Sequence, residues 1–121
     1  MDRLAQTHSP RDAILQAFAA AAQRESDHPP GCLLVNTALE LSPHDPEVAA
    51  MVQSSLDQVK LFFCAMLRAA RRAGTIPADV SVEEKGAALL SLFLGLRVMA
   101  RAGMNDEGTQ AVLDQAEAML G

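Results

Sequence analysis

The chain of 121 residues is poor in aromatic side chains, because it contains no Trp and no Tyr and its four aromatic residues are all Phe. β-Strands favour aromatic and β-branched residues, so this shortage argues against a fold built on sheets. Half of the residues are apolar, and Ala, Leu and Met, which favour helices, are plentiful. We therefore expect an all-α fold, in one domain, since single domains commonly have about 100 to 150 residues.

Positive charge is also scarce, with ten Lys and Arg against fifteen Asp and Glu and a net charge of −5. No basic run is longer than Arg71-Arg72. An acidic chain is repelled by a phosphate backbone, so we do not expect these residues alone to bind nucleic acid.

Cysteines and long apolar runs are few. Cys32 and Cys64 lie far apart without a CxxC spacing, so we expect free thiols in a reducing compartment and no zinc site. The longest apolar stretch, Gly86 to Leu96, is shorter than the roughly 18 residues of a membrane span, and the first residues lack the features of a signal peptide. A soluble, cytoplasmic protein without a metal or cofactor is expected.

Catalytic motifs are missing as well. Glu25 and His28 have the E-x-x-H spacing of di-iron bundles, but this pair occurs once and stands beside Pro29. No Ser/His/Asp set, Gly-rich phosphate loop or pair of inward carboxylates can be placed. We do not expect an enzyme.

Helix start and stop signals divide the chain into five predicted helices, of which three precede Thr75. Ser9-Pro10 is an N-cap with proline at the first helical position and opens a helix that ends near residues 24–27. A short apolar helix, residues 31–41, lies between two proline-marked breaks. Asp45-Pro46 then starts the longest helix, which Gly74 closes as a C-terminal cap.

The two last helices follow from similar signals. The capping box Ser81 to Glu84 opens a helix that runs to about Ala102 and is closed by Gly103. Asn105 or Asp106 caps the final helix.

One face of the long helix is predicted to be buried. Its apolar stripe consists of Val48, Val52, Ser55, Leu56, Val59, Phe62, Phe63, Met66, Leu67 and Ala70. The opposite, polar face carries Asp57, Lys60, Cys64, Arg68 and Arg71. Three arginines, Arg68, Arg71 and Arg72, crowd the last turns, where cations interact favourably with the helix dipole, so we interpret them as structural.

The helix from Val82 to Ala102 has apolar residues nearly all round, which a surface helix of a small monomer should not have. Its bulky side, which we assign to the core of the same chain, consists of Leu89, Phe93, Leu96 and Ala100. Its small side consists of Ala88, Ser91, Gly95, Val98 and Ala102, flanked by Leu92 and Met99. Small residues at this spacing let helix backbones approach closely, so we assign this side to a second subunit.

The last helix adds a neighbouring stripe to this predicted dimer interface, consisting of Val112, Leu113, Ala116, Met119 and Leu120. Two antiparallel helices from each subunit would form an intermolecular four-helix bundle. The alternative is that the first two helices cover the small side within one chain.

The order of these elements resembles a known family. The run "GCLLVNTALEL", the Asp-Pro before the long helix, and "AARRAGTIPADVSVEEKGAALLSLFLGLRVMARAG" before a short closing helix are similar to the C-terminal domain of TetR/AcrR-family transcriptional regulators, from about Ser9 onwards. The resemblance implies a five-helix effector-binding and dimerisation domain over residues 1–121. The last two helices would form the dimer bundle and the preceding helices would enclose a pocket for a small inducing molecule.

Members of that family begin with a basic helix-turn-helix domain, which these residues do not contain. Residues 1–8 look like the remnant of the connecting helix. DNA binding is therefore expected only through a helix-turn-helix domain absent from this chain, and we expect either a fragment or a gene without that domain.

Polar residues of the predicted helix 31–41 form one line, because Cys32, Asn36 and Glu40 are four residues apart. The Asn36 amide faces either a ligand pocket or a neighbouring helix end, since buried amides must be hydrogen-bonded somewhere. Cys32 is either a reactive thiol near a helix N-terminus or a buried inert one.

Inward positions of three predicted helices are candidates to line a ligand pocket, or else ordinary core: Leu15, Phe18, Phe62, Phe63, Met66, Leu89 and Phe93. Arg97 is the one charge deep in the apolar stretch. It would meet a ligand carboxylate or Glu40, or else extend to solvent near the helix C-terminus. We expect a homodimeric repressor domain that senses a small, largely apolar molecule; the alternative is a protein-interaction module without a ligand site.

Overall fold

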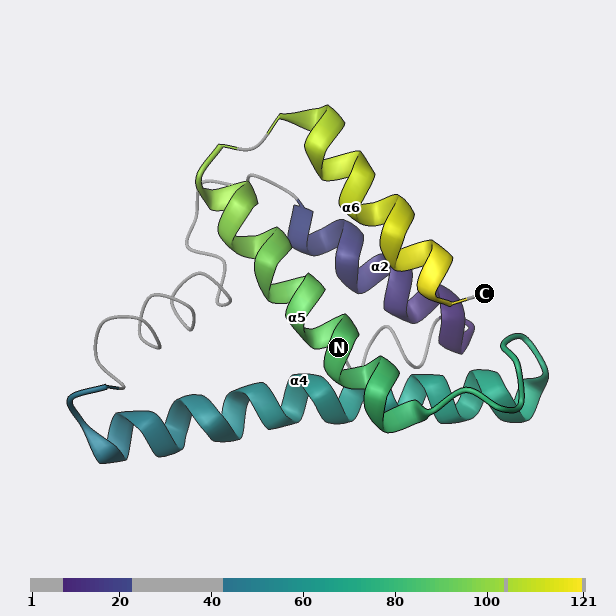
Figure 1. The fold of residues 1–121 in the computed structure, drawn as a ribbon, viewed down its shortest axis with the longest axis horizontal. Helices are drawn as coiled ribbons and strands as arrows, with labels where there is room; N and C mark the ends of the chain where they lie inside the picture. The colour runs from purple at the N-terminus through teal and green to yellow at the C-terminus, as the bar shows by residue number, and fades with distance from the viewer. Residues whose placement is uncertain (1–7, 23–42, 104, 121) are drawn as a thin grey trace.

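The computed structural model describes residues 8–22, 43–103 and 105–120 of the chain. These residues form helices and no strands, in the order α2 (Pro10–Ala22), α4 (Pro46–Ala73), α5 (Val82–Arg101) and α6 (Asp106–Met119) (Figure 1). The all-α prediction is confirmed for this part of the chain. The predicted short helix, with Cys32, Asn36 and Glu40, lies outside the described residues.

The signals that predicted α4 act as expected. The Asp45 carboxylate accepts hydrogen bonds from the backbone N–H groups of Glu47 at 3.0 Å and Val48 at 3.3 Å. These bonds satisfy two of the N–H groups that the first turn of a helix leaves without a backbone partner. At the other end Gly74 adopts a left-handed conformation, φ 79°, which only glycine adopts readily.

The capping residues of α5 and α6 also agree with the prediction from the sequence. Ser81 Oγ accepts a hydrogen bond from Glu84 N at 3.3 Å, and α5 ends at Arg101, with Ala102 as its C-cap and Gly103 at φ 91° after it. Asn105, rather than Asp106, caps α6, because its side-chain oxygen accepts from Gly108 N at 2.8 Å.

Three of the helices lie side by side and cross the fourth. In Figure 1, α2, α5 and α6 run in a similar diagonal direction, and α4 runs across their lower end. α5 packs against α2, α4 and α6, and α2 also packs against α4 and α6. α5 therefore contacts every other described helix.

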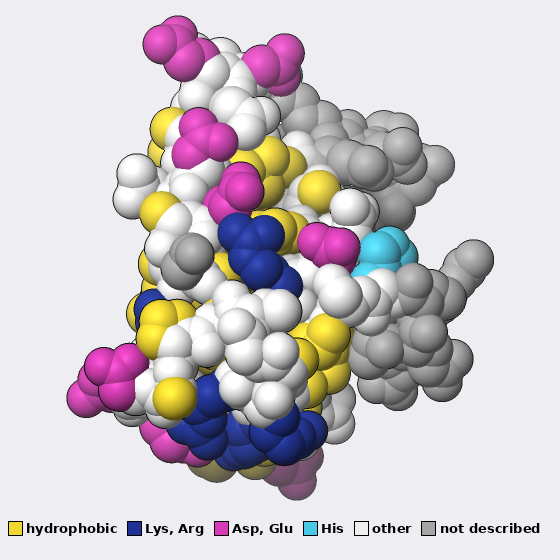
Figure 2. Space-filling model, turned by 90° about the vertical axis from the view of Figure 1, so that its right-hand side faces the viewer, with side chains coloured by type: hydrophobic (Ala, Val, Ile, Leu, Met, Phe, Trp, Pro, Cys, Tyr) yellow, Lys and Arg dark blue, Asp and Glu magenta, His cyan; other side chains and the backbone are white. Residues whose placement is uncertain are grey.

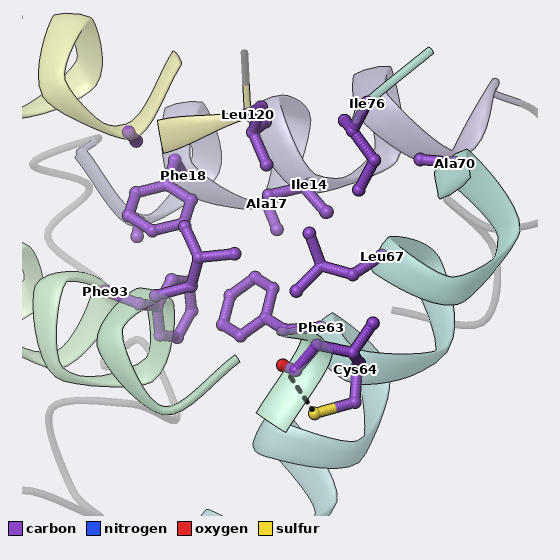
Figure 3. Packing of buried hydrophobic residues seen from close by; sticks show 14 of the residues in the cluster. Ile14, Ala17, Phe18, Phe63, Cys64, Leu67, Ala70, Ile76, Phe93 and Leu120 are labelled. Atoms are coloured by element: carbon purple, nitrogen blue, oxygen red, sulfur yellow. Dashed lines mark hydrogen bonds between the residues drawn. The ribbon is translucent and has the colours of Figure 1, made fainter. Parts of the chain in front are cut away.

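The hydrophobic core lies where these helices meet (Figure 3). The bulky side of α5 is buried as predicted, since Leu89, Phe93, Leu96 and Ala100 are at most 7% exposed. The facing side chains from the other helices include Ile14 and Phe18 of α2, Phe63 and Leu67 of α4, and Leu120 just after α6. Burying one large apolar side chain contributes about 1.5 to 3 kcal/mol, so this shared core is the main source of stability.

Polar contacts at the surface connect the same helices. Arg11 of α2 pairs with Glu117 of α6 at 3.6 Å, and Glu83 of α5 pairs with Lys60 at 3.4 Å and Arg68 at 3.6 Å on α4. Exposed pairs of this kind contribute about 0 to 1 kcal/mol each, so they orient the helices more than they stabilise them.

Cys64 was predicted to lie on the polar face of α4, and this was wrong. The side chain is 2% exposed, and its Sγ donates a hydrogen bond to the carbonyl oxygen of Val82 at 3.8 Å (Figure 3). The start of α5 packs against this side of α4, and Gly86, which has no side chain, leaves room for the sulfur. Burial raises the pKa of the Cys64 thiol, and the nearby Glu83 carboxylate raises it further.

Candidate functional site: a phenylalanine cluster and an uncovered helix face

All four phenylalanines of the chain meet in one cluster, which we call the phenylalanine cluster. Phe18 of α2, Phe63 of α4 and Phe93 of α5 form a triangle with ring centroids 5.5 to 5.6 Å apart. Phe62 stands at 5.6 Å from Phe63 in an edge-on orientation. Aromatic pairs in such tilted geometries contribute about 0.5 to 1.5 kcal/mol each beyond the burial of their area. Three helices are thus held together at one point.

The structure brings together the described side chains that were predicted to line a pocket. Phe18, Phe63, Leu89 and Phe93 are buried, with at most 4% of their surface exposed. The other three, Leu15, Phe62 and Met66, are half-buried and pack against the same core. We call these three half-buried side chains the outer edge of the phenylalanine cluster.

Arg97 lies one helical turn beyond Phe93, and its guanidinium carbon is 5.3 Å from the centre of the Phe93 ring. The side chain is half-buried, and its Nε is buried without a hydrogen-bond partner among the described residues. A buried donor that makes no hydrogen bond costs about 1 to 3 kcal/mol. The structure therefore places a positive group, incompletely paired, beside the phenylalanine cluster.

The small side of α5 is uncovered. Ala88, Ser91, Gly95, Val98 and Ala102 are all exposed, and Met99 beside them is 46% exposed. Leu92, the other flanking residue, is half-buried. The Ser91 hydroxyl donates to the carbonyl of Ala87 in its own helix at 3.2 Å, so its polar group is already satisfied. In the part of the chain that the structure describes, Phe18 of α2 packs against Phe93 on the bulky side, so the alternative that the first two helices cover the small side does not hold for α2.

The predicted interface residues of α6 divide into two groups. Ala116 and Leu120 are 0% and 1% exposed and belong to the core of their own chain, so they offer no surface to a second subunit. Val112, Leu113 and Met119 are half-buried at the edge of that core. α6 therefore offers a narrower apolar surface than its sequence pattern predicted.

Basic residues gather at the end of α4, where Arg68, Arg71 and Arg72 are exposed. The side view shows Lys and Arg side chains collected low on this face of the molecule (Figure 2). Arg71 donates from Nη1 to the carbonyl oxygen of Val80 at 3.1 Å, and Arg68 pairs with Glu83. These bonds connect α4 with the start of α5, which agrees with a structural role.

Two contacts between helices were not expected from the sequence. Lys85 of α5 donates from Nζ to the carbonyl oxygen of Met119 at the end of α6. Gly86 lies against Cys64. The only signal for the second contact was a glycine inside a helix, which costs about 1 kcal/mol relative to alanine and therefore calls for a packing reason.

The described residues contain no group of three or more His, Cys, Asp and Glu that could hold a metal ion. Among them there is also no helix that is long and apolar enough to cross a membrane.

The comparisons with known proteins agree with this architecture. A family model described as "Tetracyclin repressor-like, C-terminal domain" matches residues 10–116. The chain belongs to this family. The TetR-like domain is also 26% identical over 123 residues to an uncharacterized HTH-type transcriptional regulator, YezE, of Bacillus subtilis (strain 168).

That alignment covers 99% of the TetR-like domain but 63% of the Bacillus protein, so the chain spans less than two thirds of its relative's length. No solved structure matches the chain significantly. The resemblance to the TetR/AcrR C-terminal domain, drawn from the order of the motifs, is confirmed by the family match.

Proposed function

We propose that this TetR-like domain binds a small, largely apolar effector and forms a homodimer within a transcriptional regulator. The observation that carries the proposal is the division of α5 into two apolar sides. One side holds Phe93 in the phenylalanine cluster, and the other is exposed and made of small residues. A single helix thereby connects a candidate ligand site with a candidate dimer interface.

The dimer proposal is supported by the exposure of apolar surface that burial would stabilise. Val98 and Met99 are 41% and 46% exposed on the uncovered side of α5. A Cβ built at Gly95 meets no atom within 4 Å, so the backbone is accessible to a second helix there. Val112, Leu113 and Met119 of α6 would extend the contact, giving two helices per subunit in a four-helix bundle.

The ligand proposal is supported by the outer edge of the phenylalanine cluster. Leu15, Phe62 and Met66 come from two helices and are half-buried against the same core. Met is flexible and polarisable and adapts to guests of irregular shape, while aromatic rings offer large apolar contact areas. An apolar effector inserted here would press on the contacts that hold α5 to α2 and α4.

The mechanism that follows is a shift between two packings of α5. An effector that binds one packing more tightly increases its population, and the altered position of α5 is transmitted to the dimer partner. DNA would be contacted by a helix-turn-helix domain of the kind that the name of the Bacillus relative implies. Effector binding would change the spacing of two such domains in the dimer.

A thermal-shift screen with small apolar molecules tests the proposal. We expect at least one compound to raise the melting temperature of the wild-type domain, because a ligand that binds only the folded state stabilises it. Phe62→Ala should abolish the shift, since it removes the ring at the outer edge of the cluster. Leu61→Ala is the matched control. Leu61 is next to Phe62 in the chain, but its side chain is 62% exposed, so its loss should leave the shift unchanged.

The absence of any stabilising compound would distinguish the two candidate functions. A dimer that no apolar compound stabilises would contradict the ligand site and support a protein-interaction module of the same fold.

A further inference from the structure

The guanidinium group of Arg97 has an unusual environment for a charge in this chain. It lies over the face of the Phe93 ring, and its Nε is buried without a hydrogen-bond partner among the described residues. Charged groups in apolar surroundings are normally paired with an opposite charge, because removal from water is otherwise costly. The contact with Phe93 compensates only part of that cost.

The acidic side chains that form ion pairs in the described part of the chain are engaged elsewhere. Glu83 pairs with Lys60 and Arg68, and Glu117 pairs with Arg11. No carboxylate of the described residues lies within ion-pair distance of Arg97. The described residues therefore supply no anion to the Arg97 guanidinium, and a bound molecule could complete its hydrogen bonds.

A purely structural role at the helix end does not account for this geometry. Arginines near a helix C-terminus are favourable because they approach the last carbonyl groups. The guanidinium of Arg97 instead lies over Phe93, four residues earlier in the helix and directed away from its C-terminal end. The charge is thus held beside the phenylalanine cluster and away from the helix terminus.

We propose that Arg97 recognises a carboxylate on the effector, whose apolar body lies against the outer edge of the phenylalanine cluster. This inference rests on the proposed ligand site and adds the chemical class of the ligand, an amphiphilic monocarboxylate. The planar guanidinium offers parallel N–H donors that match the two oxygens of a carboxylate.

Decanoate and decanamide are suitable probes, because they share one apolar chain and differ in charge. Both would be titrated into the full chain by calorimetry, with decanoate below its micellar concentration. The wild-type protein should bind decanoate about tenfold or more tightly than decanamide, as expected for hydrogen bonds to charged groups. Arg97→Gln should remove this preference while leaving the affinity for decanamide within about twofold, and Arg97→Lys, which keeps the charge but not the two-pronged geometry, should retain part of it.

The possible outcomes separate the role of Arg97 from the existence of the ligand site. Equal affinities of the wild-type protein for the two probes, or a preference that survives in Arg97→Gln, would overturn the assignment of Arg97 while leaving the apolar ligand site intact. Failure of both probes to bind the wild-type protein would contradict the ligand site itself and this inference with it. Binding of decanamide by Arg97→Gln also shows that the variant is folded.

Discussion

At the scale of single residues, the approach of α5 to α4 depends on Gly86, which has no side chain. A Cβ built at Gly86 would lie 2.5 Å from Cys64 Sγ, closer than real atoms approach. The helical wheel placed Cys64 on the polar face because it counts the polarity of neighbours in one helix. A helical wheel of α4 contains no information about α5, which packs on that face. The burial of Cys64 could therefore not be predicted from the spacing of polar residues along α4.

The substitution Gly86→Ala tests this contact. Alanine favours helix by about 1 kcal/mol over glycine, but overpacking a core costs about 1 to 3 kcal/mol, so we expect net destabilisation. Urea denaturation should show a lower midpoint for Gly86→Ala than for the wild-type protein.

A second comparison separates the contact from the helix propensity. Adding Cys64→Ala to Gly86→Ala should recover part of the lost stability, since it removes the sulfur that the new methyl group meets. Stabilisation by Gly86→Ala alone would show that the two helices do not approach as closely as described.

At the scale of helices, the sequence was most informative where the chemistry is local. The caps of α4 and α5 and the start of α6 depend on residues within three or four positions of each other, so their side chains identified them. The choice between Asn105 and Asp106 could not be made beforehand, because both side chains can cap a helix. The contacts between helices depend on residues far apart in the chain. In the sequence, only the bulky side of α5 indicated where such contacts would form.

The cap of the longest helix provides a prediction at this scale. Asp45→Ala removes the acceptor of two backbone N–H groups at the start of α4, and we expect the free energy of unfolding to fall by about 0.5 to 2 kcal/mol. Asp57→Ala, an exposed acidic residue in the middle of the same helix, should change it by less than about 0.5 kcal/mol. Equal effects of the two substitutions in chemical denaturation would contradict the capping role.

At the scale of the whole molecule, the candidate site was predicted in part. The convergence of three helices on the phenylalanine cluster followed from their inward stripes, because apolar faces must be buried against each other. The apolar stripe of α6 was assigned in full to the dimer interface, although part of it is buried in its own chain. An apolar pattern shows that a face is buried, but not whether the same chain or another one covers it. Ala116 and Leu120 pack within their own chain, while the small side of α5 is left open.

A charge on that open side should prevent the proposed dimer without harming the subunit. Gly95→Glu adds a side chain that meets nothing in its own chain, and glutamate is a better helix former than glycine. In the proposed interface the same carboxylate would be buried against a second helix without a partner, which is strongly unfavourable. Light scattering should therefore report a folded monomer for Gly95→Glu, and an unchanged mass for Ala65→Glu on the exposed face of α4.

The mass of the wild-type chain in solution tests the central claim most directly, because the proposed function needs α5 to join a ligand site to a second subunit. Sedimentation equilibrium at micromolar concentration should give twice the 12.9 kDa of one chain. A mass of one chain under these conditions would contradict the account, since the exposed apolar side of α5 would then have no second copy to cover it.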